Sequence, residues 1–388
     1  MSEGHLSPPL AAPREALLVV LMALSSIALF AIFPYLALYL KTQFALGDGQ
    51  AGLAVGGMAL ISSCGAWFGG RIVDRLGWLG VLRGACVLWI AVLALLYQAR
   101  SLPAVLVLIG MIGVCRMLME PALKTALVLH DDGTGRLFKR RYMTLVAGAI
   151  AGPVLSTAFA PFGPQAAFGL AAILFAVHFA LTLLLRAGAA APAAPSPAGP
   201  GVDRRTVLLL IALGFLFFVG FSQYESTLSL RLAGAFPVGI GLYRRLLLLN
   251  AALAIPMMHA SDKLLGRLAM RTQVAIGVIA FAIAMALLFG ARDAGLVYIG
   301  ATLFTLGEVI LFPLPDIAAA RLSTHNRGRL MGLVDLRYLG FFVGPALGGA
   351  MLERSPGALA VLLCAGALAI HPVYLASEAC GRRVEAAR

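Results

Sequence analysis

Long apolar stretches constrain the fold of this chain more than any other feature. A helix needs about 20 mostly apolar residues to cross a bilayer. Lipid offers no hydrogen-bond partners, so each crossing segment must satisfy its own backbone as a helix. The first stretch is too long for the core of a signal peptide, and we expect it to be retained. Twelve spans are predicted, at residues 15–40, 51–70, 79–99, 103–125, 142–162, 166–186, 207–230, 240–260, 273–291, 295–318, 330–352 and 357–376.

Composition agrees with an all-α integral membrane protein. Only 12% of the residues are charged, whereas soluble domains carry about 25%. The alternating two-residue period of an outer-membrane barrel is absent. The five cysteines have neither metal-ligand nor redox spacing, so they are interpreted as structural. No metal site and no cofactor are predicted.

A segment rich in Ala, Pro and Gly separates the sixth and seventh predicted spans. It reads AGAAAPAAPSPAGPGVDRR and has the composition of a flexible linker. We therefore expect an N-terminal six-helix bundle over residues 1–186, a cytoplasmic linker over 187–206 and a C-terminal six-helix bundle over 207–388.

The basic residues predict the orientation of these spans. With the N-terminus inside, the inner loops hold most of the Lys and Arg residues, including Arg136, Lys139, Arg140 and Arg141 in one loop. Outer loops hold single basic residues such as Arg100 and Arg292. A multi-pass protein of the inner (cytoplasmic) membrane with both termini cytoplasmic is expected. The positive charge is spread over every inner loop, which argues against a nucleic-acid partner.

Landmarks in one half recur at nearly the same separation in the other. Asp74 and Asp262 each follow an even-numbered span, and Pro121 and Pro313 lie in the fourth and tenth spans. The pairs Gly152-Pro153 and Gly344-Pro345 lie in the fifth and eleventh. These repeats predict two pseudo-symmetric bundles. Parallel repeats of this kind are typical of transporters whose substrate site lies at the repeat interface.

Three motifs resemble those of the major facilitator superfamily, in particular its bacterial twelve-span drug:proton antiporters. GGRIVDRLG at residues 69–77, followed by Arg83, resembles the superfamily's loop between the second and third spans. GAIAGPVLS at 148–156 and GFFVGPALGG at 340–349 resemble the fifth-span motif of the antiporters. The resemblance implies a major facilitator fold and a set of latch and motif residues: Gly70, Asp74, Arg75, Gly77, Arg83, Gly148, Gly152, Pro153, Gly344 and Pro345.

Physical chemistry supports a role for these residues. Gly77 permits a tight reversal of the backbone, and Asp74 can face a helix N-terminus, where the dipole favours negative charge. In the family this aspartate is thought to latch the two halves in the outward-open state. The alternative is a loop charge that only sets topology. Pro153 must bend its helix, either for movement against the other half or for packing alone.

Ionisable residues at membrane depth are candidate functional groups because they are costly there. Arg116 lies near the middle of the fourth span, and Glu120 follows one turn later, so the two can pair on one helix face. Glu308 occupies the position equivalent to Arg116 in the second half. Glu225 lies among polar residues in the seventh span. Glu225, Glu308 and Glu120 are the proton-coupling candidates, although Glu225 can also bind substrate or simply end a helix at the surface.

The candidates for the substrate cavity are Arg116 and four further polar or aromatic residues, namely Gln223, Tyr35, Tyr39 and Arg245. These four residues can instead face lipid or the membrane surface. Asp316, Asp335 and Arg337, near the inner ends of the tenth and eleventh spans, are interpreted as a gate or a packing cluster.

These features together predict a proton-coupled exporter of small molecules, of the multidrug type, that works by alternating access. The alternative is a dedicated exporter of an anionic metabolite such as a carboxylate siderophore. An integral membrane enzyme is not expected, because the loops are short and the longest is the Ala/Pro linker. The expected partners are a small-molecule substrate, protons and the lipid bilayer, and the family resemblance implies a monomer.

Overall fold

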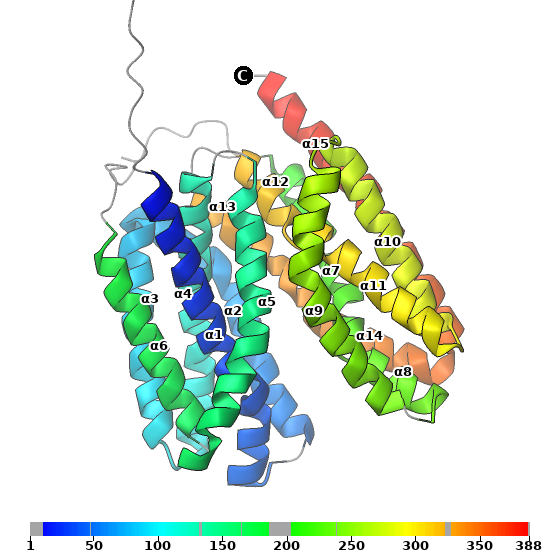
Figure 1. Ribbon diagram of the computed structural model, residues 1–388. Coiled ribbons are helices and arrows are strands. Elements are labelled where there is room, and N and C mark those ends of the chain that lie inside the picture. Colours follow the sequence, from blue (N-terminus) through cyan, green and yellow to red (C-terminus); the bar gives the residue numbers. More distant parts are fainter. Residues whose placement is uncertain are drawn as a thin grey trace, which may run out of the picture.

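Helices make up almost all of the residues that the computed structural model describes, which are 11–46, 48–131, 134–163, 165–185, 203–237, 239–322 and 327–386. Figure 1 shows two groups of long helices that lie side by side. The first half contains α1 (Ala11–Phe44), α2 (Asp48–Leu76), α3 (Trp78–Gln98), α4 (Leu102–His130), α5 (Arg136–Phe159), η1 (Ala160–Phe162) and α6 (Ala166–Leu183). The second contains α7 (Arg204–Glu225), α8 (Thr227–Ala235), α9 (Gly239–Leu265), α10 (Met270–Gly290), α11 (Ala294–Leu311), α12 (Leu314–Leu322), α13 (Arg327–Val334), η2 (Asp335–Leu339), α14 (Gly340–Arg354) and α15 (Pro356–Ala386).

Ten segments of the described residues are long and apolar enough to cross a membrane. The prediction of an all-helical membrane protein is confirmed, and the predicted twelve spans fit this architecture. The two spans beyond these ten correspond to α5 and α9, which carry charged residues close to their ends. Most of the linker predicted over 187–206 lies outside the described residues.

Three of the predicted spans are broken rather than continuous. The seventh comprises α7 and α8, which meet at Ser226, and the tenth comprises α11 and α12, which meet at Phe312 and Pro313. Proline has no backbone N–H to continue the helical ladder, which explains the second break. The eleventh span begins as α13, tightens into the short helix η2 and continues as α14. These breaks place backbone ends and polar side chains inside the second half.

Each half has its own hydrophobic core. In the first half, Trp89 of α3 stacks on Phe175 of α6 with ring centroids 4.5 Å apart. In the second, Tyr224 of α7 stacks on Phe304 of α11 at 4.1 Å. Separate cores allow each half to keep its internal packing while the contacts between the halves change.

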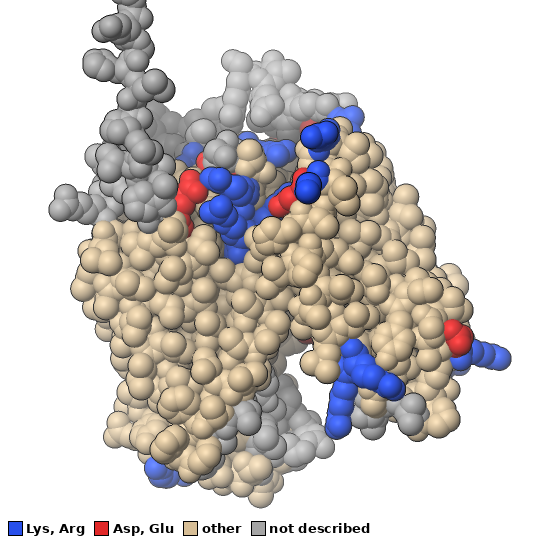
Figure 2. Space-filling view, viewed as in Figure 1, with Lys and Arg blue, Asp and Glu red and all other residues tan. Residues whose placement is uncertain are grey.

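The two halves touch closely at one end of the molecule. We call this the charged end and define it by Asp74, Lys139, Asp262 and Arg271. Figure 2 shows Lys, Arg, Asp and Glu gathered there, and a hollow between the halves toward the opposite end. At the charged end α2 crosses α13 so tightly that a Cβ on Gly70 would run into the carbonyl of Gly328. The structure is therefore closed at the charged end.

Candidate functional site

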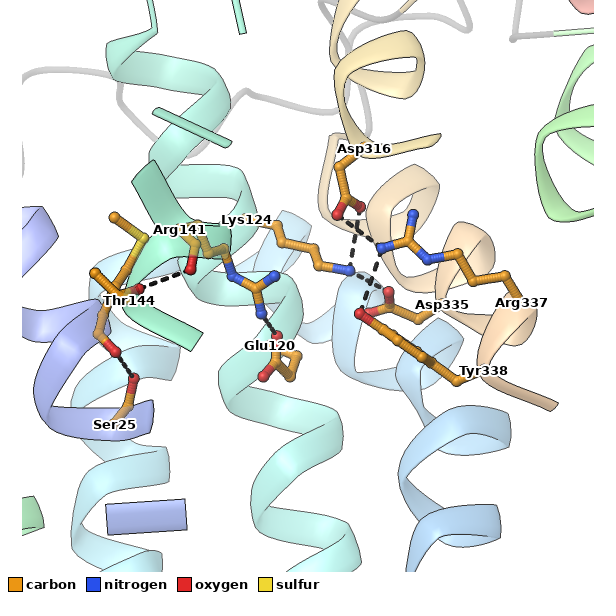
Figure 3. A network of polar contacts seen from close by, with 10 residues as sticks. Ser25, Glu120, Lys124, Arg141, Thr144, Asp316, Asp335, Arg337 and Tyr338 are labelled. Atoms are coloured by element: carbon orange, nitrogen blue, oxygen red, sulfur yellow. Dashed lines mark hydrogen bonds and ion pairs between the residues drawn. The ribbon is translucent and has the colours of Figure 1, made fainter. Parts of the chain in front are cut away.

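A buried ionic network joins the halves close to the charged end. Lys124 of α4 forms an ion pair with Asp316 of α12 at 3.2 Å and a second one with Asp335 of η2. Arg337 of η2 donates a hydrogen bond of 2.7 Å to Asp316. Figure 3 shows these side chains pointing toward one another, with Tyr338 beside them. Four charges without access to solvent must neutralise one another, so this geometry favours close contact of the halves.

The network continues into the first half through Glu120 and Arg141. Glu120 accepts a hydrogen bond from Arg141 of the neighbouring helix α5 (Figure 3). The sequence allowed Glu120 to pair with Arg116 one turn away on its own helix; in the structure its hydrogen-bonded partner is Arg141, and the charge of Arg116 acts on Glu120 without an ion pair within the described residues. Arg141 is 5% exposed and approaches from the adjacent helix, so it brings a counter-charge to Glu120 from outside α4.

Arg116 instead forms no ion pair within the described part of the chain. Its guanidinium carbon lies 5.8 Å from the centroid of the Phe33 ring on α1. Its buried Nε atom has no hydrogen-bond partner among the described residues. The side chain lines a small cavity inside the first half, together with Trp89, Glu120 and Arg141.

A second polar cluster surrounds Glu308 in the last turn of α11. The Asn250 side chain of α9 donates to Glu308 at 2.7 Å and to Thr305 at 3.0 Å. Tyr142 of α5, from the other half, lies close enough to Glu308 to interact with it electrostatically. Glu308 is only 5% exposed. Its neighbours are neutral hydrogen-bonding groups, which distinguishes it from Glu120.

Glu225 and Gln223 lie at the break between α7 and α8. Glu225 is exposed, and its backbone carbonyl accepts a hydrogen bond of 2.9 Å from Tyr243. It is near enough to Glu308 for their charges to interact. Gln223 is fully buried and donates to the carbonyl of Val219 at 3.1 Å. Gln223 thus lies inside the second half rather than on an open surface.

The structure places the other cavity candidates in different surroundings. Tyr39 is buried and meets Phe168 edge-on at 5.0 Å, so it belongs to the core of the first half. Arg245 is exposed on α9. The side chain of Tyr35 lies outside the described residues.

The Asp74 side chain spans the two halves. It accepts hydrogen bonds from the backbone N–H groups of Gly328 at 2.8 Å and Arg329 at 2.9 Å, in the first turn of α13. Here the N-terminal helix dipole favours its negative charge. Asp262, the equivalent residue of the second half, instead forms an ion pair with Lys139 of α5. The two related turns therefore make contacts of different kinds between the halves.

Gly70 of the first motif faces α13 of the other half, whereas Gly77, Arg75 and Arg83 act within one half. Gly77 has φ of 79° and begins α3, a conformation that glycine adopts without strain. Arg75 is exposed in the last turn of α2. Arg83 donates hydrogen bonds of 2.8 and 2.9 Å to the carbonyls of Thr182 and Leu185, at the end of α6. Arg83 thus satisfies carbonyls that the end of a helix leaves unpaired.

The glycines of the fifth-span motifs form close crossings inside each half. A Cβ on Gly148 would lie 2.6 Å from Cβ of Ser26, and one on Gly152 would lie 2.6 Å from N of Ala31, both on α1. A Cβ on Gly344 would meet the Ser222 hydroxyl of α7. Pro153 and Pro345 lie inside α5 and α14. We considered packing against the opposite half, whereas these glycines face the first helix of their own half.

Sequence reasoning missed two residues of these clusters. Arg141 was interpreted as a topological charge in a loop, yet it lies within the first turns of α5 and reaches Glu120. Asn250 was not considered, although a lone amide within LLLLNAALA is itself a signal of a buried polar contact.

Comparison with known proteins places this architecture in a family. The family model of the Major Facilitator Superfamily matches residues 18–336. The uncharacterised MFS-type transporter YqjV of Bacillus subtilis is 28% identical over 338 residues, which cover 82% of this chain and 82% of that protein. The crystal structure of the transporter FucP in the outward conformation superposes with a TM-score of 0.79 at 14% identity, covering 93% of this chain and 98% of that one. The human organic anion transporter TETRAN gives 0.78 at 16% identity, covering 95% and 100%.

The fold thus defines a multi-pass membrane transporter, and the chain belongs to the major facilitator superfamily. The predicted resemblance to this superfamily is confirmed. As a transporter of this family, the protein is not an enzyme.

Proposed function

We propose that this transporter is a proton-coupled exporter of small organic molecules that works by rocker-switch alternating access. It acts as a monomer in the cytoplasmic membrane, with the charged end and both termini on the cytoplasmic side. Retention of Lys and Arg in cytoplasmic loops supports this orientation. Residues 1–186 and 207–388 are the two moving units, and residues 187–206 link them.

On this proposal the structure represents the outward-open state. Asp74, Lys124 and Lys139 of the first half contact the second half at the charged end. The hollow between the halves lies toward the opposite end (Figure 2). Asp74 then serves as a latch, because its contacts with α13 require the halves to be together at the charged end.

The observation that carries proton coupling is the environment of Glu308. This carboxyl is nearly inaccessible to solvent, lies within a membrane span and is held by the neutral amide of Asn250. A carboxyl group in such a place can exchange a proton as its hydration changes during the transport cycle. Glu225 is exposed nearby and supplies a second carboxyl on the same side of the second half. Glu120 is already engaged by Arg141 and ranks below both.

Transport in inside-out membrane vesicles tests the proposal. We expect uptake of a lipophilic cation, such as tetraphenylphosphonium, to require a proton gradient and to stop when a protonophore is added. Glu308→Gln should remove the dependence on the gradient. Glu378→Gln, which removes an acid at the charged end, is the matched control and should retain it. Uptake in Glu308→Gln that still follows the gradient contradicts the assigned role of Glu308.

A second candidate function is export of an anionic metabolite such as a carboxylate siderophore. The unpaired Nε of Arg116 and the exposed side chains of Arg244 and Arg245 favour it, because they offer positive charge to a substrate. In the same vesicles, this candidate predicts gradient-dependent uptake of a citrate-type siderophore and none of the lipophilic cation.

A further inference from the structure

A small cavity inside the first half has a positively charged and donor-rich lining. It lies between α1, α3, α4, α5 and α6, and its polar walls include Arg116, Glu120, Arg141 and Trp89. It has room for a group of a few atoms. Pockets for whole drug-sized molecules are much larger, about 300–1,000 Å³. The cavity therefore suits one polar group of a ligand rather than an entire ligand.

Around this cavity Arg116 forms no ion pair within the described residues, although its charge also acts on Glu120. Glu120 accepts a hydrogen bond from Arg141, which neutralises that pair (Figure 3). Lys124, two turns along α4, is engaged by Asp316 and Asp335. Arg116 has no ion-pair partner in the described parts of the chain and is only half-buried, so its guanidinium is accessible to a ligand.

A second unpaired donor belongs to Trp89, which also lines this cavity. The indole of Trp89 is 1% exposed, and its Nε1–H has no hydrogen-bond partner among the described residues. A buried donor left unpaired costs about 1–3 kcal/mol. Arginine and indole nitrogens can only donate, so a ligand that satisfies both must supply acceptor atoms. Trp89 also stacks on Phe175, which gives the cavity an apolar aromatic wall.

We propose that this cavity is an anion-binding subsite that takes the carboxylate of a small organic acid. Arg116 supplies the cation, Trp89 supplies the second donor, and the stacked rings of Trp89 and Phe175 contact the apolar part of the ligand next to the carboxylate. The inference rests on the proposed transport function, because it assigns the carboxylate to the transported substrate. It selects organic acids as the substrate class.

The subsite shares a helix with the contacts that close the charged end. Residues 116, 120 and 124 follow one another at single-turn intervals along one face of α4. A ligand charge beside Arg116 therefore acts on the helix that carries Lys124 into the second half. Binding of a ligand in the subsite can therefore affect the ion pairs that Lys124 forms with the second half.

Calorimetric titration of the full-length transporter in lipid nanodiscs tests this inference. The probes are benzoate and citrate, with benzamide as the neutral analogue of benzoate. We expect at least one of the two carboxylates to bind and benzamide to bind at least about tenfold more weakly than benzoate, since the charge supplies much of the interaction. Arg116→Gln should weaken binding of the carboxylate at least about tenfold, and Arg116→Lys by less, because a lysine keeps the charge but loses the planar fork.

Trp89→Phe removes the indole donor while keeping an aromatic ring against Phe175, and it should weaken binding about three- to tenfold. Arg267→Gln removes an exposed arginine far along the chain and is the matched control for charge; it should bind as the unaltered protein does. Size-exclusion profiles establish that each variant is folded. Equal binding of carboxylate by Arg116→Gln and Arg267→Gln overturns the subsite.

Absence of binding by both benzoate and citrate to the unaltered protein also overturns it. If the protein exports a lipophilic cation on a proton gradient but binds neither carboxylate, the subsite is wrong and the proposed function stands. If benzoate binds through Arg116 but no substrate moves protons, the subsite stands and proton coupling is wrong.

Discussion

Replacing Lys124 by methionine should open the charged end. Lys124 is fully buried and belongs to the first half, whereas both of its partners, Asp316 and Asp335, belong to the second. In Lys124→Met the Asp316 carboxylate keeps Arg337, but Asp335 loses its ion-pair partner in a site that is 2% exposed. Opening the charged end returns water to that carboxylate, so the variant penalises the closed state selectively.

The expected size of the shift follows from the cost of a broken buried pair. Removing one partner of such a pair costs about 3–5 kcal/mol. At about 1.4 kcal/mol per factor of ten, the balance between closed and open charged ends should shift by about two to three and a half orders of magnitude toward the open form. If water does not reach Asp335 in the open form, that form bears part of the same cost. The calculated shift is therefore an upper bound.

Electron-electron distance measurements in nanodiscs can follow this equilibrium. Spin labels at Leu76, at the end of α2, and Leu268, after α9, are exposed, and they report on opposite halves at the charged end. The five native cysteines must first be replaced. We expect one short distance in the parent protein and a dominant longer distance in Lys124→Met. The control Lys263→Met removes an exposed lysine and should keep the short distance. An unchanged distance distribution in folded Lys124→Met would refute the reasoning.

Three further changes test other contacts. In Gly70→Ala, the added Cβ collides with the facing backbone of α13, so the same labels should report a larger open population. Asp74→Asn removes a charge at a helix N-terminus and should favour opening of the charged end by about 0.3–2 kcal/mol. Asp262→Asn breaks an ion pair that is largely exposed, so it should change the same equilibrium by at most about 1 kcal/mol. In Gly348→Ala, the methyl group meets the buried side chains of Gln223 on α7 and Thr227 on α8, and scanning fluorimetry should show a loss of about 1–3 kcal/mol of stability. Gly349→Ala has open space and should show little loss.

The sequence predicted the fold because membrane-spanning helices are specified locally. A run of about 20 apolar residues is sufficient to indicate a span, and repeated Gly-Pro pairs indicate the two related bundles. The breaks at Ser226 and at Asp335–Leu339 were not predicted. They depend on how α8 and η2 pack against neighbours that are distant in sequence.

The partners of the charged residues were less predictable for the same reason. The chemistry of Asp74 indicates that it can face a helix N-terminus. It does not indicate which helix, because Gly328 at the start of α13 lies 254 positions away in the sequence. Pairing of Arg116 with Glu120 was possible within α4 alone. In the structure α5 brings Arg141 to Glu120, and α12 and η2 bring acids to Lys124. Composition alone cannot show which of several arginines remains unpaired after such neighbours have assembled.

Proton movement in proteoliposomes tests the central claim most directly. A pH-sensitive dye trapped inside reports proton flux when substrate is added, for the parent protein, Glu308→Gln and Glu225→Gln in parallel. The proposal predicts a flux driven by at least one small organic substrate, abolished in Glu308→Gln while the variant still binds that substrate. Substrate transport by the parent protein without any accompanying proton flux would contradict the account.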